Sequence, residues 1–204
     1  MMSVSVSGDG SADRSLVLAT RNPHKLNEMR CLLEPAGIAV EPLPDEVDLP
    51  PEDGLTFADN ALPKALTAAA ATGRVAIADD SGIEAADLSG APGVRSARYA
   101  GVGASDEANL AKLEAEVSSD SRLRYVCALA YVNPETGEER VFFGDCRGRM
   151  ARARAGSGGF GYDPVFVPDA TGDNRTMAEL TDAEKDAISH RGHAVRALLR
   201  WIRL

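Results

Sequence analysis

The chain has 204 residues, of which 44% are hydrophobic and 26% are charged. This balance is typical of a folded globular protein and excludes disorder of the whole chain. Asp and Glu outnumber Lys and Arg by 31 to 22, and the resulting net charge of -9 disfavours binding to a nucleic-acid backbone. This net charge does not exclude the binding of a small phosphate ligand, because a few local cations outweigh a distant acidic surface.

Cellular location is suggested by what the sequence lacks. Cys31, Cys127 and Cys146 have neither disulfide nor metal-ligand spacing and are interpreted as core residues in a reducing compartment. No apolar run is long enough to span a membrane, so no membrane partner is predicted. Residues 1–14 lack the apolar segment of a signal peptide and are interpreted as a flexible tail. We expect a single domain over residues 15–204, in the cytoplasm.

The N-terminal part of that domain is predicted to alternate strands and helices. Residues 15–20 form a short apolar run that predicts a buried strand. Asn22 as N-cap and Pro23 at the first helical position then begin a helix, which Gly37 ends. Residues 38–43 predict a second strand. The strand–helix–strand order indicates an α/β domain.

The next predicted elements are a helix and a strand that ends at two aspartates. A helix is expected over residues 56–72, and Pro63 within it should either kink the helix or move its start to Asn60. Residues 75–78 predict another buried strand. We expect that strand to end at residues 79–82 (DDSG), where the backbone turns.

A long hairpin dominates the C-terminal part of the prediction. Residues 123–132 and 140–147 alternate or run apolar around a turn at 134–137. The other expected elements are extended chain over 83–88, a helix from Ser105 or Asp106 to about Val117, an edge strand over 150–154, a strand over 164–167, a helix begun by a capping box of Thr181 and Glu184, and a closing helix over 190–202 capped by Ser189.

Residues 20–25 (TRNPHK) lie at a predicted strand-to-helix turn. Free amides at a helix N-terminus, together with Lys25, can hold a phosphate because the helix dipole and the N–H groups both favour an anion. The alternative is an ordinary capped helix with a solvated lysine. The segment is not a Walker A loop, because its glycines are absent.

Acidic residues supply the candidates for a metal site. Glu52, Asp53, Asp79 and Asp80 are carboxylates, and the last two follow a buried strand. Paired carboxylates at such a place are costly unless they are solvated or bind a cation. Oxygen ligands beside a phosphate suit Mg²⁺. The alternative is that Asp79 and Asp80 cap a turn.

Residues 156–163 (GSGGFGYD) combine glycines with two aromatic rings and a carboxylate. Glycine lets the backbone approach a flat ligand closely, and Phe160 could stack on a base. The alternative is a flexible loop with its aromatic rings in the core. Near the last helix, Lys185, His190 and Arg191 offer donors for a phosphate or for the keto oxygens of a purine.

Three other patterns carry less chemistry. His190 and His193 lie three residues apart, but no third zinc ligand accompanies them. Ser81 has no histidine base near it in the sequence, which disfavours a nucleophilic serine. The arginines at 147, 149, 152 and 154 indicate either a phosphate patch or protection of an edge strand.

Five motifs occur in a fixed order along the chain: LATRNPHK, GLTFADNALPKA, ADDSG with GAPGVRSARYAG, GSGGFGYDP, and ELTDAEKDAISHRG. Together they resemble the inosine/xanthosine triphosphate pyrophosphatase family over residues 16–199. The resemblance implies an α/β fold with a mixed, elongated central sheet, flanking helices, and two lobes around a long substrate cleft. It also implies a homodimer. The implied activity is Mg²⁺-dependent hydrolysis of inosine, deoxyinosine and xanthosine triphosphates to monophosphate and pyrophosphate, which cleanses the nucleotide pool.

The same resemblance implies roles for individual residues. Glu52 and Asp80 would bind Mg²⁺, with Asp80 as the proton acceptor and Asp79 in support. Phe160 would stack on the base, while Lys185, His190 and Arg191 would read the purine and its 6-keto edge. The full set of substrate-binding residues would be Thr20, Arg21, Asn22, Pro23, His24, Lys25, Lys64, Ser81, Phe160, Gly161, Tyr162, Asp163, Lys185, His190 and Arg191.

Three residues depart from the family pattern, and other functions remain as alternatives. Arg21, Asp59 and Pro63 differ from the residues usual in the family, and each could change a neighbouring contact. One rival is a pyrophosphatase of the septum-inhibitor type, acting on modified pyrimidine triphosphates. Another is a nucleotide-sensing module that binds without hydrolysis. A structural interaction protein would leave the carboxylates and the glycine-rich loop unexplained.

Overall fold

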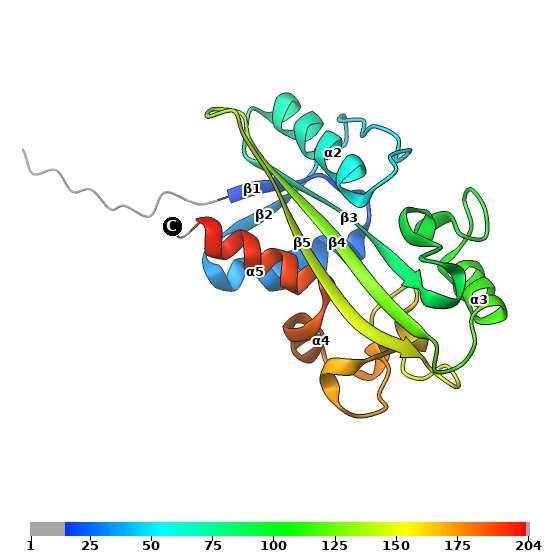
Figure 1. Ribbon diagram of the computed structural model, residues 1–204. Helices are drawn as coiled ribbons and strands as arrows, with labels where there is room; N and C mark the ends of the chain where they lie inside the picture. Colours follow the sequence, from blue (N-terminus) through cyan, green and yellow to red (C-terminus); the bar gives the residue numbers. More distant parts are fainter. Residues whose placement is uncertain (1–14, 203–204) are drawn as a thin grey trace, which may run out of the picture.

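The centre of the molecule is a mixed sheet of six strands in the order β2-β1-β3-β4-β5-β6 (Figure 1). This computed structural model describes residues 15–202, so the predicted flexible tail lies outside the described residues. β2 and β3 are parallel to β1, and each later strand is antiparallel to its predecessor. The strands are β1 (Ser15–Leu18), β2 (Ala39–Pro42), β3 (Ala76–Ala85), β4 (Arg122–Asn133), β5 (Glu138–Met150) and β6 (Phe166–Pro168).

Helices cover both faces of this sheet, with α2 on one face and α5 on the other (Figure 1). Alanines of α2 pack against small residues of β3 and β4, whereas leucines and valines of α1 and α5 pack against the opposite face. A third apolar cluster lies along the half of the β4–β5 hairpin that is away from its turn, beside α3. The helices are α1 (Pro23–Leu33), α2 (Phe57–Thr72), α3 (Asp106–Glu116), α4 (Asp182–Ile188) and α5 (His190–Ile202). Within residues 15–202, none is long and apolar enough to cross a membrane.

The predicted caps of α1 are confirmed. Asn22 accepts the first amides of the helix and Pro23 occupies its first position. The helix ends at Leu33 and continues as a 3₁₀ turn, which Gly37 closes at a φ of 77°. This positive φ explains the glycine, because other residues adopt it only with strain.

The start of α2 differs from one predicted alternative. The helix begins at Phe57, ahead of Pro63, so a start delayed to Asn60 is wrong. The physical reason is a capping box in which Thr56 and Asp59 satisfy each other's backbone amides. The carboxylate of Asp59 is thus used as a helix cap.

β3 is longer than predicted, because the backbone does not turn at residues 79–82. The strand continues to Ala85 and pairs with β4 over its whole length. The extended chain expected over 83–88 is therefore confirmed as far as Ala85, and a 3₁₀ turn (Ala86–Leu88) replaces the rest. It is β1 that ends early, with Leu18 opposite Ile77. Asp79 and Asp80 therefore lie in the middle of a strand, at the point where its neighbour stops.

The C-terminal elements follow the prediction with two exceptions. The hairpin and the capping box of α4 are confirmed, and the hydroxyl of Ser189 accepts from the amide of Gly192 at the start of α5. The edge strand expected over 150–154 is wrong, because Met150 ends β5. The strand expected from residue 164 begins at Phe166, since a 3₁₀ turn occupies residues 163–165.

Asp186 on α4 gives a pH-dependent prediction. Burial, the carboxylate of Glu28 and the carboxylate of Asp182 raise the pKa of Asp186 to about 6. In the unfolded chain the pKa is about 3.9. The folded state thus binds more protons between these values, and Asp186 lowers stability as pH rises through this window. We expect Asp186→Asn to raise the melting temperature above pH 6, with a gain that shrinks towards pH 4 in thermal unfolding scans. A gain that is equal at both pH values would contradict this assignment.

Candidate functional site

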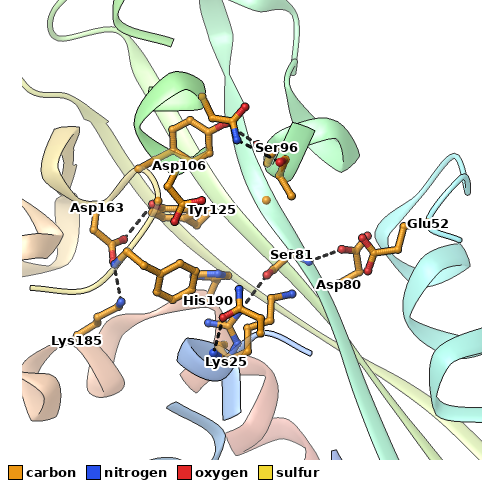
Figure 2. Close-up of a pocket in the computed structure, with 18 residues that line it drawn as sticks. Lys25, Glu52, Asp80, Ser81, Ser96, Asp106, Tyr125, Asp163, Lys185 and His190 are labelled. Carbon is orange, nitrogen blue, oxygen red and sulfur yellow. Dashed lines mark hydrogen bonds and ion pairs between the residues drawn. The ribbon is translucent and has the colours of Figure 1, made fainter. Parts of the chain in front are cut away.

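A pocket opens where β1 stops and β3 continues (Figure 2). It contains about 750 Å³ of space free of protein atoms when its open mouth is included. The predicted site residues that line it are Asn22, Lys25, Glu52, Asp80, Ser81, Phe160, Gly161, Tyr162, Asp163, Lys185, His190 and Arg191. The predicted residues that do not line it are Thr20, Arg21, Pro23, His24 and Lys64.

The open edge of β3 explains why residues from both faces of the sheet meet in this pocket. Side chains alternate along a strand, so Asp79 and Asp80 point to opposite faces. Asp80 contacts Asn60 of α2, whereas Asp79 contacts Arg191 of α5. With no β1 residue beside this part of β3, groups from either face can reach a shared ligand at the edge.

The start of α1 differs from the predicted phosphate cradle. Asn22 Oδ1 accepts from the amides of His24 and Lys25 at 2.9 and 3.3 Å, and the amide of Asn22 donates to Thr20 Oγ1 at 3.1 Å. Pro23 has no N–H to offer. The expected free amides are therefore occupied. The groups of this segment that line the pocket are the side chains of Asn22 and Lys25.

Arg21 has a structural contact instead of a place in the pocket. Its guanidinium donates to the backbone carbonyls of Leu43, Pro44, Asp45 and Val47 at 2.7–3.2 Å. These bonds fix the chain that follows β2. Arg21, which differs from the residue usual in the family, thus anchors residues 43–47 and does not line the pocket.

Asp79 is the centre of a buried charge network. Its Oδ2 accepts from Arg191 Nη2 at 2.9 Å and from Ser81 Oγ at 3.1 Å, and it lies 3.1 Å from Lys25 Nζ. Burial alone raises the pKa of this carboxyl, but the cations of Lys25, Arg191 and Lys64 outweigh it and hold the pKa far below its ordinary value. Asp79 is therefore an anion at neutral pH that orients Lys25, Ser81 and Arg191, while the supporting role implied by the resemblance stays a prediction.

Arg191 is committed to the same network. All three guanidinium nitrogens are engaged, with Nε and Nη2 donating to Asp79, Nη2 to Ser81 Oγ, and Nη1 to Glu28. The side chain is 1% exposed. These contacts favour a role in positioning Asp79 and Ser81, whereas the base-reading role implied by the resemblance stays a prediction.

Glu28 joins this network to the other end of the pocket, and the sequence analysis missed it. Its carboxylate accepts from Arg191 through one oxygen and lies 2.7 Å from Lys185 Nζ through the other. Burial raises the pKa of Glu28, but the cations of Arg191 and Lys185 outweigh this and lower it overall. The signal was present in the spacing, because Glu28 follows Lys25 by three residues and so shares its helix face.

Glu52 and Asp80 bound the opposite wall, and Figure 2 shows them side by side at one end of the pocket. Lys64 donates to Glu52 and, at 2.8 Å, to the carbonyl oxygen of Asp79. Burial and the nearby charge of Glu52 raise the pKa of Asp80, against the hydrogen bond from Asn60 and the charge of Lys64. Asp80 is thus a carboxylate whose negative charge is incompletely balanced by the protein.

The donors of this pair fit a magnesium site whose other ligands are water or phosphate oxygens. Mg²⁺ is commonly held by one or two carboxylates together with water and phosphate oxygens. A cation would also relieve the cost of the buried charge on Asp80. Within residues 15–202, no group of three or more His, Cys, Asp or Glu residues is arranged to hold a metal. A cation at Glu52 and Asp80 would also use water and phosphate oxygens as ligands.

The far end of the pocket is built around Asp163. Its Oδ2 accepts from the amide of Phe160 at 3.0 Å and from Lys185 Nζ at 2.7 Å, while its Oδ1 accepts from Tyr125 Oη at 3.0 Å. Lys185 Nζ also lies 5.1 Å from the centre of the Phe160 ring. These contacts connect the glycine-rich segment to β4 and α4, and Tyr162 of the same segment packs in an apolar cluster.

The ring of Phe160 already has an aromatic neighbour. His24 stacks on it with ring centres 5.1 Å apart and planes 16° from parallel. His24 is exposed and Phe160 is half-buried. Lys185 Nζ also lies over this ring, so the predicted stacking of a base on Phe160 requires His24 or Lys185 to move.

His190 presents one nitrogen to the pocket. Its ring stacks on Tyr125 with centres 4.7 Å apart, and its Nδ1 is buried without a partner in the described chain. Burial, together with the cations of Arg191 and Lys185, lowers the pKa of His190 far below its ordinary value, so the ring is neutral. An unpaired buried N–H costs more than an unpaired lone pair, so we assign the proton to Nε2. His190 is then a neutral hydrogen-bond donor.

The remaining sequence candidates lie outside the pocket. Arg147, Arg152 and Arg154 form surface ion pairs with acidic side chains, which does not support a phosphate patch. Arg147 lies in the part of β5 that does not pair with β6, which agrees with protection of an edge strand. His193 Nδ1 contacts the carbonyl oxygen of Asp145. Residues that line the pocket but that the sequence analysis did not select include Ser96, Asp106, Asn109 and Tyr125. They come from segments distant in sequence, and no local spacing connects them to the site.

The chain is similar in sequence to known proteins. The Ham1 family model matches residues 16–201. A dITP/XTP pyrophosphatase of Streptomyces coelicolor is 47% identical, covering 92% of this chain and 96% of its own. Its counterpart in Frankia alni is 49% identical with the same coverage.

Solved structures share the fold and confirm the predicted α/β class with a mixed sheet and flanking helices. A HAM1 protein from Coxiella burnetii has a TM-score of 0.81 at 41% identity, covering 93% of this chain and 98% of its own. A nucleoside-triphosphatase / dITP/XTP pyrophosphatase from Mycobacterium abscessus has a TM-score of 0.66 at 44% identity, covering 91% and 98%. With a family model spanning nearly the whole domain and relatives this similar, the chain belongs to the Ham1 family.

Proposed function

We propose that this protein hydrolyses inosine, deoxyinosine and xanthosine triphosphates to the monophosphate and pyrophosphate, with Mg²⁺ as cofactor. The names of the relatives support a nucleoside-triphosphate pyrophosphatase. The observation that carries the proposal is the pocket itself. Lys25, Glu52 and Asp80 line the end that suits phosphates, while Phe160 and the neutral donor His190 line the end that suits a base.

Within this reaction, Asn22 and Lys25 would hold phosphate oxygens, with Lys25 fixed by Asp79. Asp80 would accept the proton of the water that attacks the α-phosphorus, as the bond to the β-phosphate breaks and pyrophosphate leaves. When bound at Glu52 and Asp80, Mg²⁺ would neutralise phosphate charge and polarise the phosphorus.

Selection of the base follows from the protonation state of His190. Its Nε2–H can donate to a 6-keto oxygen, whereas the 6-amino group of adenine would leave that donor facing another donor. An unpaired buried donor costs about 1–3 kcal/mol. The same argument does not reject guanine, which also carries a 6-keto oxygen.

His190→Phe is the variant that tests this selection. Phenylalanine keeps an aromatic ring to stack on Tyr125 and removes the donor. We expect the ratio of kcat/KM for inosine over adenosine triphosphate to fall by about tenfold, the equivalent of one hydrogen bond of roughly 1.4 kcal/mol. His193→Phe, outside the pocket on the same helix, is the control and should keep the ratio. An unchanged ratio in His190→Phe would remove this residue from base selection.

The proposed function is tested by a panel of nucleoside triphosphates assayed for pyrophosphate release with and without Mg²⁺. We expect Mg²⁺-dependent release that is fastest with inosine, deoxyinosine and xanthosine triphosphates. Release chiefly from modified pyrimidine triphosphates would favour the septum-inhibitor rival. Binding without release would favour a nucleotide sensor. The implied homodimer stays a prediction, which sedimentation analysis of the purified protein tests.

A further inference from the structure

Asn60 lies between the two carboxylates assigned to the metal. On α2, its Nδ2 donates to Asp80 Oδ2 at 2.8 Å, and its Oδ1 accepts from the amide of Gly54 at 2.8 Å. Gly54 follows Glu52 by two residues in the same loop. One side chain thus contacts Asp80 of the sheet directly and the backbone next to Glu52.

This bridge is buried and closely packed. Asn60 is 3% exposed, so each lost bond would leave a polar group without water as a substitute. A Cβ atom on Gly54 would come within 2.6 Å of Asn60 Oδ1, which shows how closely the loop approaches the helix. The contact therefore fixes the loop relative to α2 with little freedom.

The other contacts of the two carboxylates do not replace this bridge. Asp80 Oδ1 accepts only from the neighbouring amide of Ser81, at 3.0 Å, and among the described side chains Asn60 alone donates to Asp80. Glu52 is held by Lys64, and its carbonyl accepts from Arg98 at 2.7 Å. Neither Lys64 nor Arg98 forms a hydrogen bond or ion pair with the Asp80 carboxylate.

We propose that Asn60 is a positioning residue that sets the orientation of Asp80 and its distance from Glu52, and through them the affinity of the site for a divalent cation. The inference rests on the proposed function and adds a residue that does not line the pocket. Groups that orient metal ligands without touching the metal commonly change its affinity by roughly 10- to 100-fold. The carboxylate of Asp80 would otherwise rotate, and the loop carrying Glu52 would shift.

The test measures cation binding and activation separately. Mn²⁺ binding to the full chain is followed by electron paramagnetic resonance, without nucleotide. We expect Asn60→Ala to weaken Mn²⁺ binding by roughly 10- to 100-fold. The Mg²⁺ concentration for half-maximal pyrophosphate release should rise by a similar factor, and high Mg²⁺ should partly restore turnover. A purely structural role would lower turnover without moving the Mg²⁺ dependence.

Thr56→Ala is the matched control. It removes the N-cap of the same helix, at a typical cost of about 1 kcal/mol, but leaves the Asn60 contacts in place. We expect it to lower the melting temperature and to leave Mn²⁺ binding unchanged. If Asn60→Ala does not fold, Asn60→Ser takes its place, because serine is polar but too short to make both contacts.

Two results would overturn the inference alone: Mn²⁺ affinity in the Asn60 variants within twofold of wild type, or an equal loss of affinity in Thr56→Ala. Different results would refute the proposed function. Wild-type protein that releases no pyrophosphate, or whose Mn²⁺ binding survives Asp80→Asn, would refute the assignment of Asp80 and with it the role of Asn60.

Discussion

Asp80→Asn is expected to lower the kcat for pyrophosphate release from inosine triphosphate by roughly 10³-fold, within the range for loss of a general base. The amide cannot accept the proton of the attacking water, and it is a weaker ligand for a divalent cation. The fold should persist, because an amide oxygen at this position can still accept from Asn60. Steady-state kinetics with saturating Mg²⁺ measure the loss, and circular dichroism with thermal unfolding verifies the fold.

The control for this experiment is Asp53→Asn, which removes an acidic charge from the same region of the molecule. Asp53 is exposed and does not line the pocket, so its replacement should leave kcat close to wild type. Near-normal pyrophosphate release by Asp80→Asn would refute its role as proton acceptor. An equal loss in both variants would attribute the effect to net charge instead of to the position of Asp80.

Arg191→Ala is expected to destabilise the protein by about 3–5 kcal/mol, the cost of removing one member of a buried ion pair. The variant leaves Asp79 and Glu28 without the guanidinium that joins them, and Asp79 is buried. The remaining cations, Lys25 and Lys185, each contact one of the two carboxylates. Urea unfolding at equilibrium measures the free-energy change, and the slope of the unfolding free energy against urea shows whether the variant unfolds in the same way.

Arg191→Lys provides the graded comparison. Lysine keeps a positive charge but cannot contact both carboxylates through a planar fork, so we expect a loss smaller than that of alanine. A change below about 1 kcal/mol in Arg191→Ala would show that the network contributes little to stability. The ratio of kcat/KM for inosine and adenosine triphosphates in the folded lysine variant tests the base-reading role, which an unchanged ratio would rule out.

Local signals in the sequence were sufficient for much of the fold. Asn22 with Pro23, and Thr181 with Glu184, predicted two helix starts, because a cap is made by residues within one turn of each other. The β4–β5 hairpin was predicted for a similar reason, since its strands adjoin along the chain. These predictions succeed because the interactions that decide them join residues that are close together in the sequence.

Predictions failed where distant segments decide the outcome. The run from Asp79 to Gly82 looked like a turn, but β4, some 50 residues later, pairs with it and keeps it extended. The start of α1 looked like a phosphate cradle, but Asn22 occupies its amides. In the second case the cap itself was predicted, and its consequence for the amides was not.

The sequence by itself determined the family resemblance, the mixed α/β class, and most of the residues that line the pocket, because motifs carry chemistry in residue identity and order. Only the tertiary structure decided which charges meet. It turned Asp79 and Asp80 to opposite faces of the sheet, enclosed Arg191 between Asp79 and Glu28, and placed Asn60 between Asp80 and the Glu52 loop. Such contacts depend on strand pairing and helix packing between remote segments, and buried charges take their properties from those neighbours.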